Sequence, residues 1–256
     1  MQTTVDLNSD LGEGFGPWRM GDDDALLDIV TSANIACGFH AGDPDVMART
    51  MRLAAARGVG IGAHPGFADL QGFGRRRLTL SAEELANLVT YQLGAAQAMA
   101  RAAGDRVRHF KLHGALSNMA SDDVEMARAC YGAALKVQPE IVIMVLPGTA
   151  MEAVVRDLGC AWAGEIFADR AYEDDARLVD RKLPGAVLHD AEAAAERIRE
   201  MLGAGAIIAR SGKRIPCRID TVCLHGDTPE AVAMARSLRQ NLESHGISVE
   251  RLKSAA

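Results

Sequence analysis

Short apolar segments that end in polar residues recur seven times along the chain. Within each segment aliphatic residues alternate with small or polar ones, and a stretch with helical spacing of apolar positions follows. The strand candidates are residues 4–8, 33–37, 59–64, 107–113, 141–146, 163–167 and 221–225. Regular alternation of strand and helix predicts a parallel sheet. We therefore expect one α/β domain over residues 1–256, closed or nearly closed into a β/α barrel, with a doubly wound open sheet as the alternative.

The expected helices are marked by capping signals at their amino-terminal ends. Asp43-Pro44 predicts a helix over residues 45–57, because an acid before a proline suits the first helical turn. Thr228-Pro229 repeats this signal before residues 230–243, and Asp190 precedes a helix that reaches about residue 202. Capping boxes, or close variants of them, are found at Ser81-x-x-Glu84, Thr149-x-x-Glu152 and Asp122-x-x-Glu125.

Polar residues share one face of several strand candidates. Successive side chains of a strand point to opposite faces, so Asp6, Asn8 and Asp10 lie together, as do His109, Lys111 and His113. Barrel interiors are usually aliphatic, and isolated buried charges are costly, so these groups must be paired or used. Five of the seven histidines belong to or lie near such segments, His189 and His245 being the exceptions. The pattern predicts one polar site at the carboxyl ends of the strands.

Lys111 and His113 form the most distinctive pair of this face. Their positions on one strand differ by roughly 6–7 Å, so both side chains can reach one ligand group. Lysine can hold an anionic oxygen and histidine can transfer a proton near neutral pH. The alternative is that Lys111 only pairs with Asp6 or Glu165 inside the barrel. His109 lies about 13 Å from His113 along the strand, too far to share a metal ion, and is expected to be structural.

The sequence does not decide whether the protein binds a metal ion. Oxygen and nitrogen ligands at strand ends are typical of barrel metal sites, but the spacing here is not diagnostic. The possible ligands are Asp6, Asn8, Asp10, His40, His64, His225 and Asp227. Residues 72–77, Gly-Phe-Gly-Arg-Arg-Arg, suit either a mobile lid with an anion-binding arginine or a solvated basic loop. The sequence contains no P-loop, no G-x-G-x-x-G and no G-x-S-x-G motif.

Composition narrows the functional class. A net charge of −6 and an aromatic content of 4% argue against a nucleic-acid partner, which needs a basic face or stacking platforms. The first residues lack the basic and apolar regions of a signal peptide, and the apolar runs are too short to span a membrane. Five cysteines without a C-x-x-C pair favour a reducing compartment. We expect a cytoplasmic protein.

Seven long motifs together resemble the LamB/YcsF family, whose members are described as the A component of the prokaryotic 5-oxoprolinase. They occur in order from the first strand candidate to the last: Val5-Asp-Leu-Asn-Ser-Asp-Leu-Gly-Glu13, Ala33-Asn-Ile-Ala-Cys-Gly-Phe-His-Ala-Gly-Asp43, Gly62-Ala-His-Pro-Gly66, Gly72-Phe-Gly-Arg-Arg76, His113-Gly-Ala-Leu116, Glu165-Ile-Phe-Ala-Asp-Arg-Ala-Tyr172 and His225-Gly-Asp-Thr-Pro229. Two positions depart from the common Lys-Pro-His-Gly-Ala-Leu-Tyr pattern. Leu112 is expected to be tolerated on the outward face, and Ser117 replaces an aromatic residue that could shape the substrate site.

The resemblance implies an irregular β/α barrel of the glycoside hydrolase/deacetylase class. It also implies an ATP-dependent cyclic-amide hydrolase that opens 5-oxo-L-proline to L-glutamate, with ATP and Mg²⁺ as cofactors and two partner subunits, B and C. Coupling to ATP suggests that the lactam carbonyl oxygen is phosphorylated before water adds. Such a site needs a base, an acid, and cations for anionic oxygens.

Roles can then be suggested for the polar residues. Asp10 or Asp6 would activate water, His113 would transfer protons, and Lys111 with Arg75 or Arg170 would bind anionic oxygens. The substrate-binding candidates are Asn8, Glu13, Asn34, His40, His64, Arg75, Glu165, Asp169, Arg170, His225 and Asp227. Two other classes remain: a metal-dependent deacetylase or amidohydrolase, and a non-catalytic ligand-binding protein.

Overall fold

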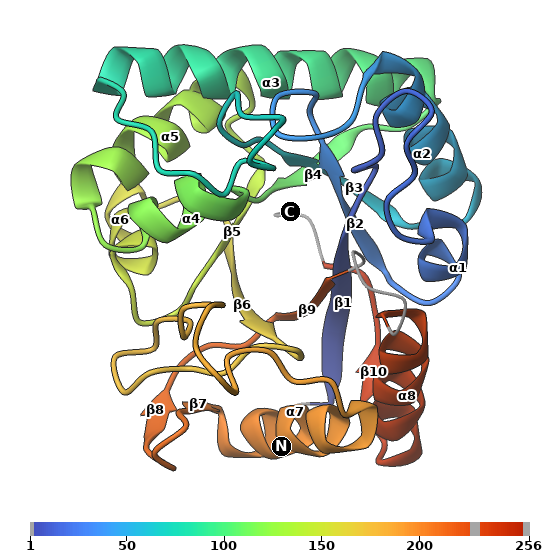
Figure 1. The fold of residues 1–256 in the computed structure, drawn as a ribbon, viewed down its shortest axis with the longest axis vertical. Helices are drawn as coiled ribbons and strands as arrows, with labels where there is room; N and C mark the ends of the chain where they lie inside the picture. Colours follow the sequence, from blue (N-terminus) through green and yellow to red (C-terminus); the bar gives the residue numbers. More distant parts are fainter. Residues whose placement is uncertain (1–2, 226–230, 253–256) are drawn as a thin grey trace.

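Seven parallel strands close into a barrel in the computed structural model, which describes residues 3–225 and 231–252. The barrel strands are β1 (Thr4–Leu11), β2 (Ser32–Ala36), β3 (Gly60–His64), β4 (Val107–Phe110), β5 (Val142–Val145), β6 (Trp162–Phe167) and β9 (Thr221–His225). β1 pairs with β2 on one side and with β9 on the other, so the barrel has no open edge (Figure 1). The predicted barrel is confirmed, and the open-sheet alternative is wrong.

Helices surround the barrel (Figure 1). They are α1 (Asp23–Leu27), α2 (Pro44–Ala56), α3 (Ala82–Ala102), α4 (Gly114–Ala120), α5 (Val124–Val137), α6 (Ala150–Leu158), α7 (Ala191–Ala204) and α8 (Ala231–Ser244). Leu7, Ile61 and Val222, which alternate with the polar positions of their strands, are completely buried in the resulting core. The polar positions therefore face the barrel interior. Among the described residues, no helix is long and apolar enough to cross a membrane.

The capping signals locate most helix starts. Asp43 accepts hydrogen bonds from the first-turn amides of α2, and Ser81 forms a reciprocal capping box at α3. The prediction at α5 is wrong by one residue, because the cap is Asp123 while Asp122 pairs with an arginine. Thr149 caps α6, but Glu152 accepts from the amide of Gly148 instead of completing the box. The Thr228-Pro229 signal lies outside the described residues.

Three short strands are absent from the sequence-based prediction. β7 (Ala206–Ile208) and β8 (Arg214–Pro216) form an antiparallel hairpin, and β10 (Ser248–Val249) pairs with the first two residues of β1. Each has two or three residues, too few for a hydrophobic period to be recognised. Between β6 and α7 the chain forms a long excursion without a helix, a further departure from the regular repeat.

The fourth strand ends earlier than predicted. β4 stops at Phe110, so Lys111 and His113 lie beyond the strand rather than in it. The chain nevertheless stays extended, because the amides of Lys111 and His113 donate to the carbonyls of Ala63 (3.0 Å) and Pro65 (2.9 Å). Their side chains therefore keep the strand alternation and both face the barrel interior, where they are buried.

Candidate active site at the carboxyl ends of the strands

Asp6 lies at the amino end of the barrel, within a set of hydroxyl groups. Its carboxylate accepts hydrogen bonds from the side chains of Thr31 (2.8 Å), Ser32 (2.7 Å) and Thr221. Burial raises the pKa of Asp6 to about 6, although these donors oppose the increase. Four residues of strand separate it from Asp10, which is about 13 Å. Asp6 thus belongs to a hydroxyl network away from Asp10, an environment typical of a structural carboxylate, and its suggested roles in activating water and in metal binding stay predictions.

A second layer of amides lies above Asp6. Asn8 donates to Thr221 (2.7 Å), and the Asn34 side chain donates to both Asn8 (2.7 Å) and Asp10 (2.8 Å). His109 Nε2 lies 2.9 Å from the Asn34 oxygen and must donate to it, since an amide oxygen only accepts. Burial lowers the pKa of His109 to about 3, so the ring is neutral. Asn8, Asn34 and His109 thus support the groups above them, and His109 has the structural environment expected for it.

Gly62 makes room for the His109 ring. A Cβ atom added at Gly62 would lie 2.0 Å from His109 Nε2, well inside any permitted contact. Gly62 belongs to the inward-facing set of β3, opposite Asn34 of β2 in register. The glycine is therefore required by the close approach of a side chain across the barrel.

Lys111 is the cation at the centre of the carboxyl end. Its Nζ atom lies 2.8 Å from Asp10 Oδ1, 2.8 Å from Glu165 Oε1 and 3.0 Å from Cys223 Sγ. Burial alone would lower the pKa of Lys111, but Asp10, Cys223 and Glu165 outweigh it and hold that pKa well above its ordinary value. The ammonium group is therefore charged, and it is fixed between side chains of β1, β6 and β9.

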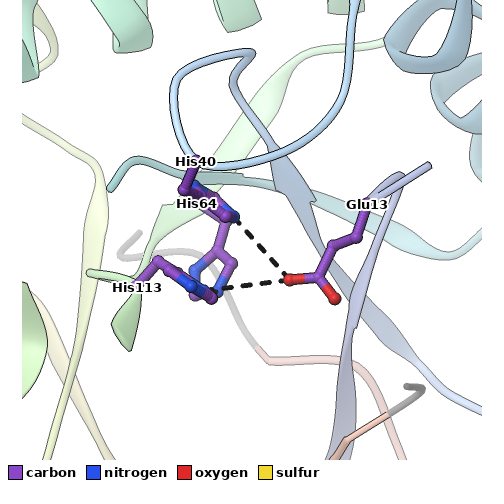
Figure 2. A group of neighbouring side chains, drawn as sticks. All are labelled: Glu13, His40, His64 and His113. Carbon is purple, nitrogen blue, oxygen red and sulfur yellow. Dashed lines mark hydrogen bonds and ion pairs between the residues drawn. The ribbon is translucent and has the colours of Figure 1, made fainter. Parts of the chain in front are cut away.

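Glu13, His40, His64 and His113 converge at the same end of the barrel (Figure 2). All four are buried, and one nitrogen or oxygen atom from each lies within 4.8 Å of the others. His64 Nε2 is 3.1 Å from His113 Nδ1 and 3.3 Å from Asp10 Oδ2. Glu13 Oε1 lies 3.7 Å from His40 Nε2 and 3.8 Å from His113 Nδ1. Among the described residues, these four side chains form a group that could hold a metal ion.

Backbone carbonyls fix how two of these rings are protonated. His64 Nδ1 lies 2.8 Å from the carbonyl oxygen of Lys111, and His113 Nε2 lies 2.8 Å from that of Phe73. A carbonyl only accepts, so each of these nitrogens carries a hydrogen. In the neutral rings the other nitrogens, His64 Nε2 and His113 Nδ1, then carry lone pairs that face each other. His113 can pass a proton to His64 only when a proton lies between these two nitrogens.

Two of the histidines are uncharged near neutral pH. Burial, followed by the neighbouring histidines, lowers the pKa of His40 and of His113 well below the ordinary value. The two rings stack with their centroids 3.7 Å apart and their planes 7° apart. Neither ring nitrogen of His40 has a hydrogen-bond partner among the residues that the structure describes. Both rings therefore present neutral nitrogens to the cluster.

The glycine-arginine segment packs directly over the histidines. Asp69 accepts from Arg76 and from the amide of Gly72, which holds the segment together. Phe73 has φ of +53°, an uncommon value for a residue with a side chain, and its carbonyl faces His113. Arg75 is exposed, with its guanidinium carbon 4.8 Å from the Phe73 ring centroid. Arg75 is therefore an exposed cation packed on Phe73, and its suggested anion-binding role stays a prediction.

Arg170 and Asp169 lie in the excursion after β6. The Arg170 guanidinium donates to the carbonyls of Val179 (2.6 Å) and Ala186 (3.4 Å), and burial lowers its pKa to about 10. Arg170 therefore orders this segment, and its suggested anion-binding role stays a prediction. Asp169 is buried, and its backbone carbonyl accepts from the amide of Leu188 within the same excursion.

Two predicted site residues are not described in full. His225 ends β9 beside Asp10, but the structure does not describe its side chain, and Asp227 lies outside the described residues. One neighbour of Lys111 is missing from the residues predicted by sequence: Cys223, whose sulfur accepts from the ammonium group. The alternation in β9 could have indicated this contact, because Cys223 shares the inward face with Thr221.

Known proteins are similar to this chain over almost its whole length. The chain is 66% identical to the A component of the 5-oxoprolinase of Ruegeria pomeroyi over 247 residues, which are 96% of this chain and 98% of that protein. It is 56% identical to the protein of the same name from Nitrobacter hamburgensis, over 98% and 99% of the two chains.

One solved structure resembles this chain in both sequence and fold, and a second resembles it in fold alone. The lactam utilization protein from Thermus thermophilus superposes with a TM-score of 0.92 at 42% identity, over 97% of this chain and all of that one. The catalytic domain of a peptidoglycan N-acetylglucosamine deacetylase from Eubacterium rectale has a TM-score of 0.54 at 11% identity, over 100% and 91% of the two chains, a likeness of fold alone. A sequence model of the LamB/YcsF family matches residues 5–256, and the chain therefore belongs to the LamB/YcsF family.

Proposed function

We propose that this chain is the A component of an ATP-dependent 5-oxoprolinase, and that the Lys111 cluster is where the lactam ring of 5-oxo-L-proline is opened to L-glutamate. The names of the two relatives described above support the activity, and both proteins match over nearly their full length. Because those names designate one component of an enzyme, they also support the presence of further subunits. Subunits B and C, ATP with Mg²⁺, and a cytoplasmic location follow from the family resemblance and are part of the proposal.

One observation carries the assignment of the site. A buried, charged Lys111 lies between Asp10 and Glu165 at the end of the barrel where β/α barrels place their chemistry. Opening an activated lactam develops negative charge on the carbonyl oxygen while water loses a proton. A fixed ammonium group stabilises that charge strongly where water is excluded. A neighbouring carboxylate accepts the proton.

The residue roles follow from these positions. Lys111 stabilises the oxygen of the reacting carbonyl or of its phosphoryl group, with Arg75 for a second anionic group. Asp10 takes the proton of the attacking water and returns it to the ring nitrogen as the carbon–nitrogen bond breaks, which leaves a carbonyl phosphate. A second water then releases inorganic phosphate from it and completes L-glutamate. Asn34 and Glu165 hold Asp10 and Lys111 in place. We assign only ring opening to this chain.

The test is L-glutamate release from 5-oxoproline, with and without ATP. We would assay this chain alone, candidate B and C subunits alone, and the three together after assembly is verified by size-exclusion chromatography. ATP-dependent release that requires all three components is the expected result. An assembled mixture that releases no glutamate contradicts the proposal, and acetylated substrates would be assayed next. Full activity in a complex lacking this chain would also contradict it.

A further inference from the structure

We propose that Glu13, His40, His64 and His113 bind one divalent transition-metal ion, with zinc as the best fit. Three imidazoles and a carboxylate are the ligand types that zinc accepts in four-coordinate sites. The four residues come from four different segments, after β1, after β2, at the end of β3 and before α4. This inference goes beyond the lactam chemistry and does not depend on the substrate.

The spacing of the ligand atoms fits a single ion. Zinc lies about 2.0–2.2 Å from nitrogen and oxygen ligands, so neighbouring ligands of a tetrahedral site are about 3.4 Å apart. The observed separations are 3.1 Å between His64 Nε2 and His113 Nδ1, and 3.7 and 3.8 Å from Glu13 Oε1 to His40 and His113. Shifts of a few tenths of an ångström would bring the contacts of His113 with His64 and Glu13 to this value, whereas His40 needs a larger movement.

The directions of the lone pairs support the same conclusion. The carbonyls of Lys111 and Phe73 take up His64 Nδ1–H and His113 Nε2–H, so the lone pairs of His64 Nε2 and His113 Nδ1 meet at close range. Two facing acceptors repel each other unless a positive centre lies between them. Metal-binding histidines commonly donate their second nitrogen to a backbone carbonyl in this manner, which fixes the ring for the ion.

The charged side chains at this end of the barrel also suit a cation. Asp10, Glu13 and Glu165 are buried there together with Lys111. A divalent ion close to buried carboxylates is attracted strongly, because little water screens the interaction.

His40 must turn to become the fourth ligand. It stacks on His113, and an ion between two stacked rings would lie out of both ring planes, away from their lone pairs. His40 packs closely against Gly66 and Gly74, where an added Cβ would lie 2.7 Å from its atoms, so the turn requires these two segments to shift with it. Zinc held by all four residues would have no open position and would stabilise this end of the barrel. Before His40 turns, the fourth position would be free for a water or a substrate oxygen, which the ion would polarise.

The decisive measurement is metal content, determined by mass spectrometry on chain purified without an affinity tag. The metal-free protein, prepared with a chelator, would then be titrated with Zn²⁺ and, for the visible spectrum, with Co²⁺. We expect about one equivalent of metal and a Co²⁺ spectrum typical of tetrahedral coordination. Glu13→Gln and His64→Asn should each weaken affinity about 100-fold or more, since a ligand is lost. His245→Asn, which removes an exposed histidine on a helix end, should change nothing.

Circular dichroism and thermal unfolding would verify that each variant is folded. Glu13→Gln preserves shape and serves if His64→Asn fails to fold. Less than about one tenth of an equivalent in folded wild-type protein supplied with excess Zn²⁺ would overturn the inference. Retention of a full equivalent by a folded Glu13→Gln or His64→Asn variant would do so as well. A chain that binds the ion but supports no glutamate release would contradict the proposed function while leaving this site standing.

Discussion

Both ends of the barrel interior are polar, but their polar groups are bonded in opposite ways. At the amino end, Asp6 is surrounded by hydroxyl donors that satisfy it, and the layer of Asn8 and Asn34 continues the network. At the carboxyl end, ionised groups cluster around Lys111, and histidine nitrogens face each other with lone pairs. At the amino end the polar groups bond to one another. At the carboxyl end several charged groups and lone pairs converge on a common space.

This difference teaches how to separate structure from chemistry in a polar barrel. Burial and polarity alone do not distinguish the ends, since Asp6 and Lys111 are both buried. The completeness of the hydrogen bonding around the polar groups distinguishes the two ends. A satisfied network specifies a unique packing, whereas convergent charges and lone pairs mark the place where a ligand or reacting atom is bound.

The largest effect is expected from Lys111→Met. Turnover of the assembled enzyme should fall about 10³-fold or more, because the cation facing the developing charge is lost. The variant also leaves Asp10 and Glu165 side by side, which should cost about 3–5 kcal/mol of unfolding free energy. Adding Glu165→Gln should recover much of that stability but none of the activity. Steady-state kinetics and urea unfolding measure the two quantities.

The control for this change is Lys182→Met, which alters an exposed lysine and should leave both quantities unchanged. If Lys111→Met kept normal turnover, Lys111 would be a structural counter-ion like the groups at the other end, and the contrast between the ends would disappear.

Gly62→Ala tests the supporting layer between the two ends. The new methyl group would overlap the His109 ring, so the protein should lose at least about 1–3 kcal/mol of stability, as overpacked cores do. Gly132→Ala is the matched control, because a Cβ there meets nothing within 4 Å in the middle of α5 and should stabilise by about 0.5–1 kcal/mol. Thermal and urea unfolding provide the comparison. Equal stability of both variants would show that His109 has space to move.

The smallest effect on activity is expected from Asp6→Asn. Because the pKa of Asp6 is raised to about 6 in the folded state, the folded protein holds an extra proton between about pH 3.8 and 6. This contribution to stability is present at low pH and is lost as pH rises through 6, by up to about 3 kcal/mol. The asparagine variant cannot titrate, so its stability relative to wild type should increase across that window. Turnover should stay within about twofold.

Urea unfolding at a series of pH values measures this difference. An Asp6→Asn variant with parallel pH dependence would place the titrating group elsewhere. Loss of turnover without loss of stability would return Asp6 to the chemistry, against the structural environment described above.

Much of the barrel could be predicted from the sequence because the inward and outward positions alternate so clearly. Seven strands, their parallel arrangement and their polar inner face follow from residues such as Asp6, Asn8 and Asp10 opposite Val5 and Leu7. The short β10 could not be predicted, since its two residues pair with β1 only after the chain has closed. Tertiary pairing rather than local pattern determines such elements.

The candidate site could be predicted as a set of residues but not as an arrangement. Strand alternation places Lys111 and His113 on one face. It also places Asp6 and Asp10 on one face, and it cannot show that they belong to different ends of the barrel. The protonation of His64 and His113 depends on carbonyls of Lys111 and Phe73, one of them in a distant loop. The metal-binding set expected from sequence includes His40 and His64 but not Glu13 or His113, whose proximity is a product of folding.

The pairing of β1 with β9 has a consequence for how the protein is made. Asp6 leaves the ribosome 215 residues before its neighbour Thr221. At ordinary rates of translation this interval is roughly 10–40 s. During that time β1, with its carboxylates, lacks the strand that completes its environment. β1 is therefore an exposed sheet edge until β9 is made, which makes it a natural segment for a chaperone to protect.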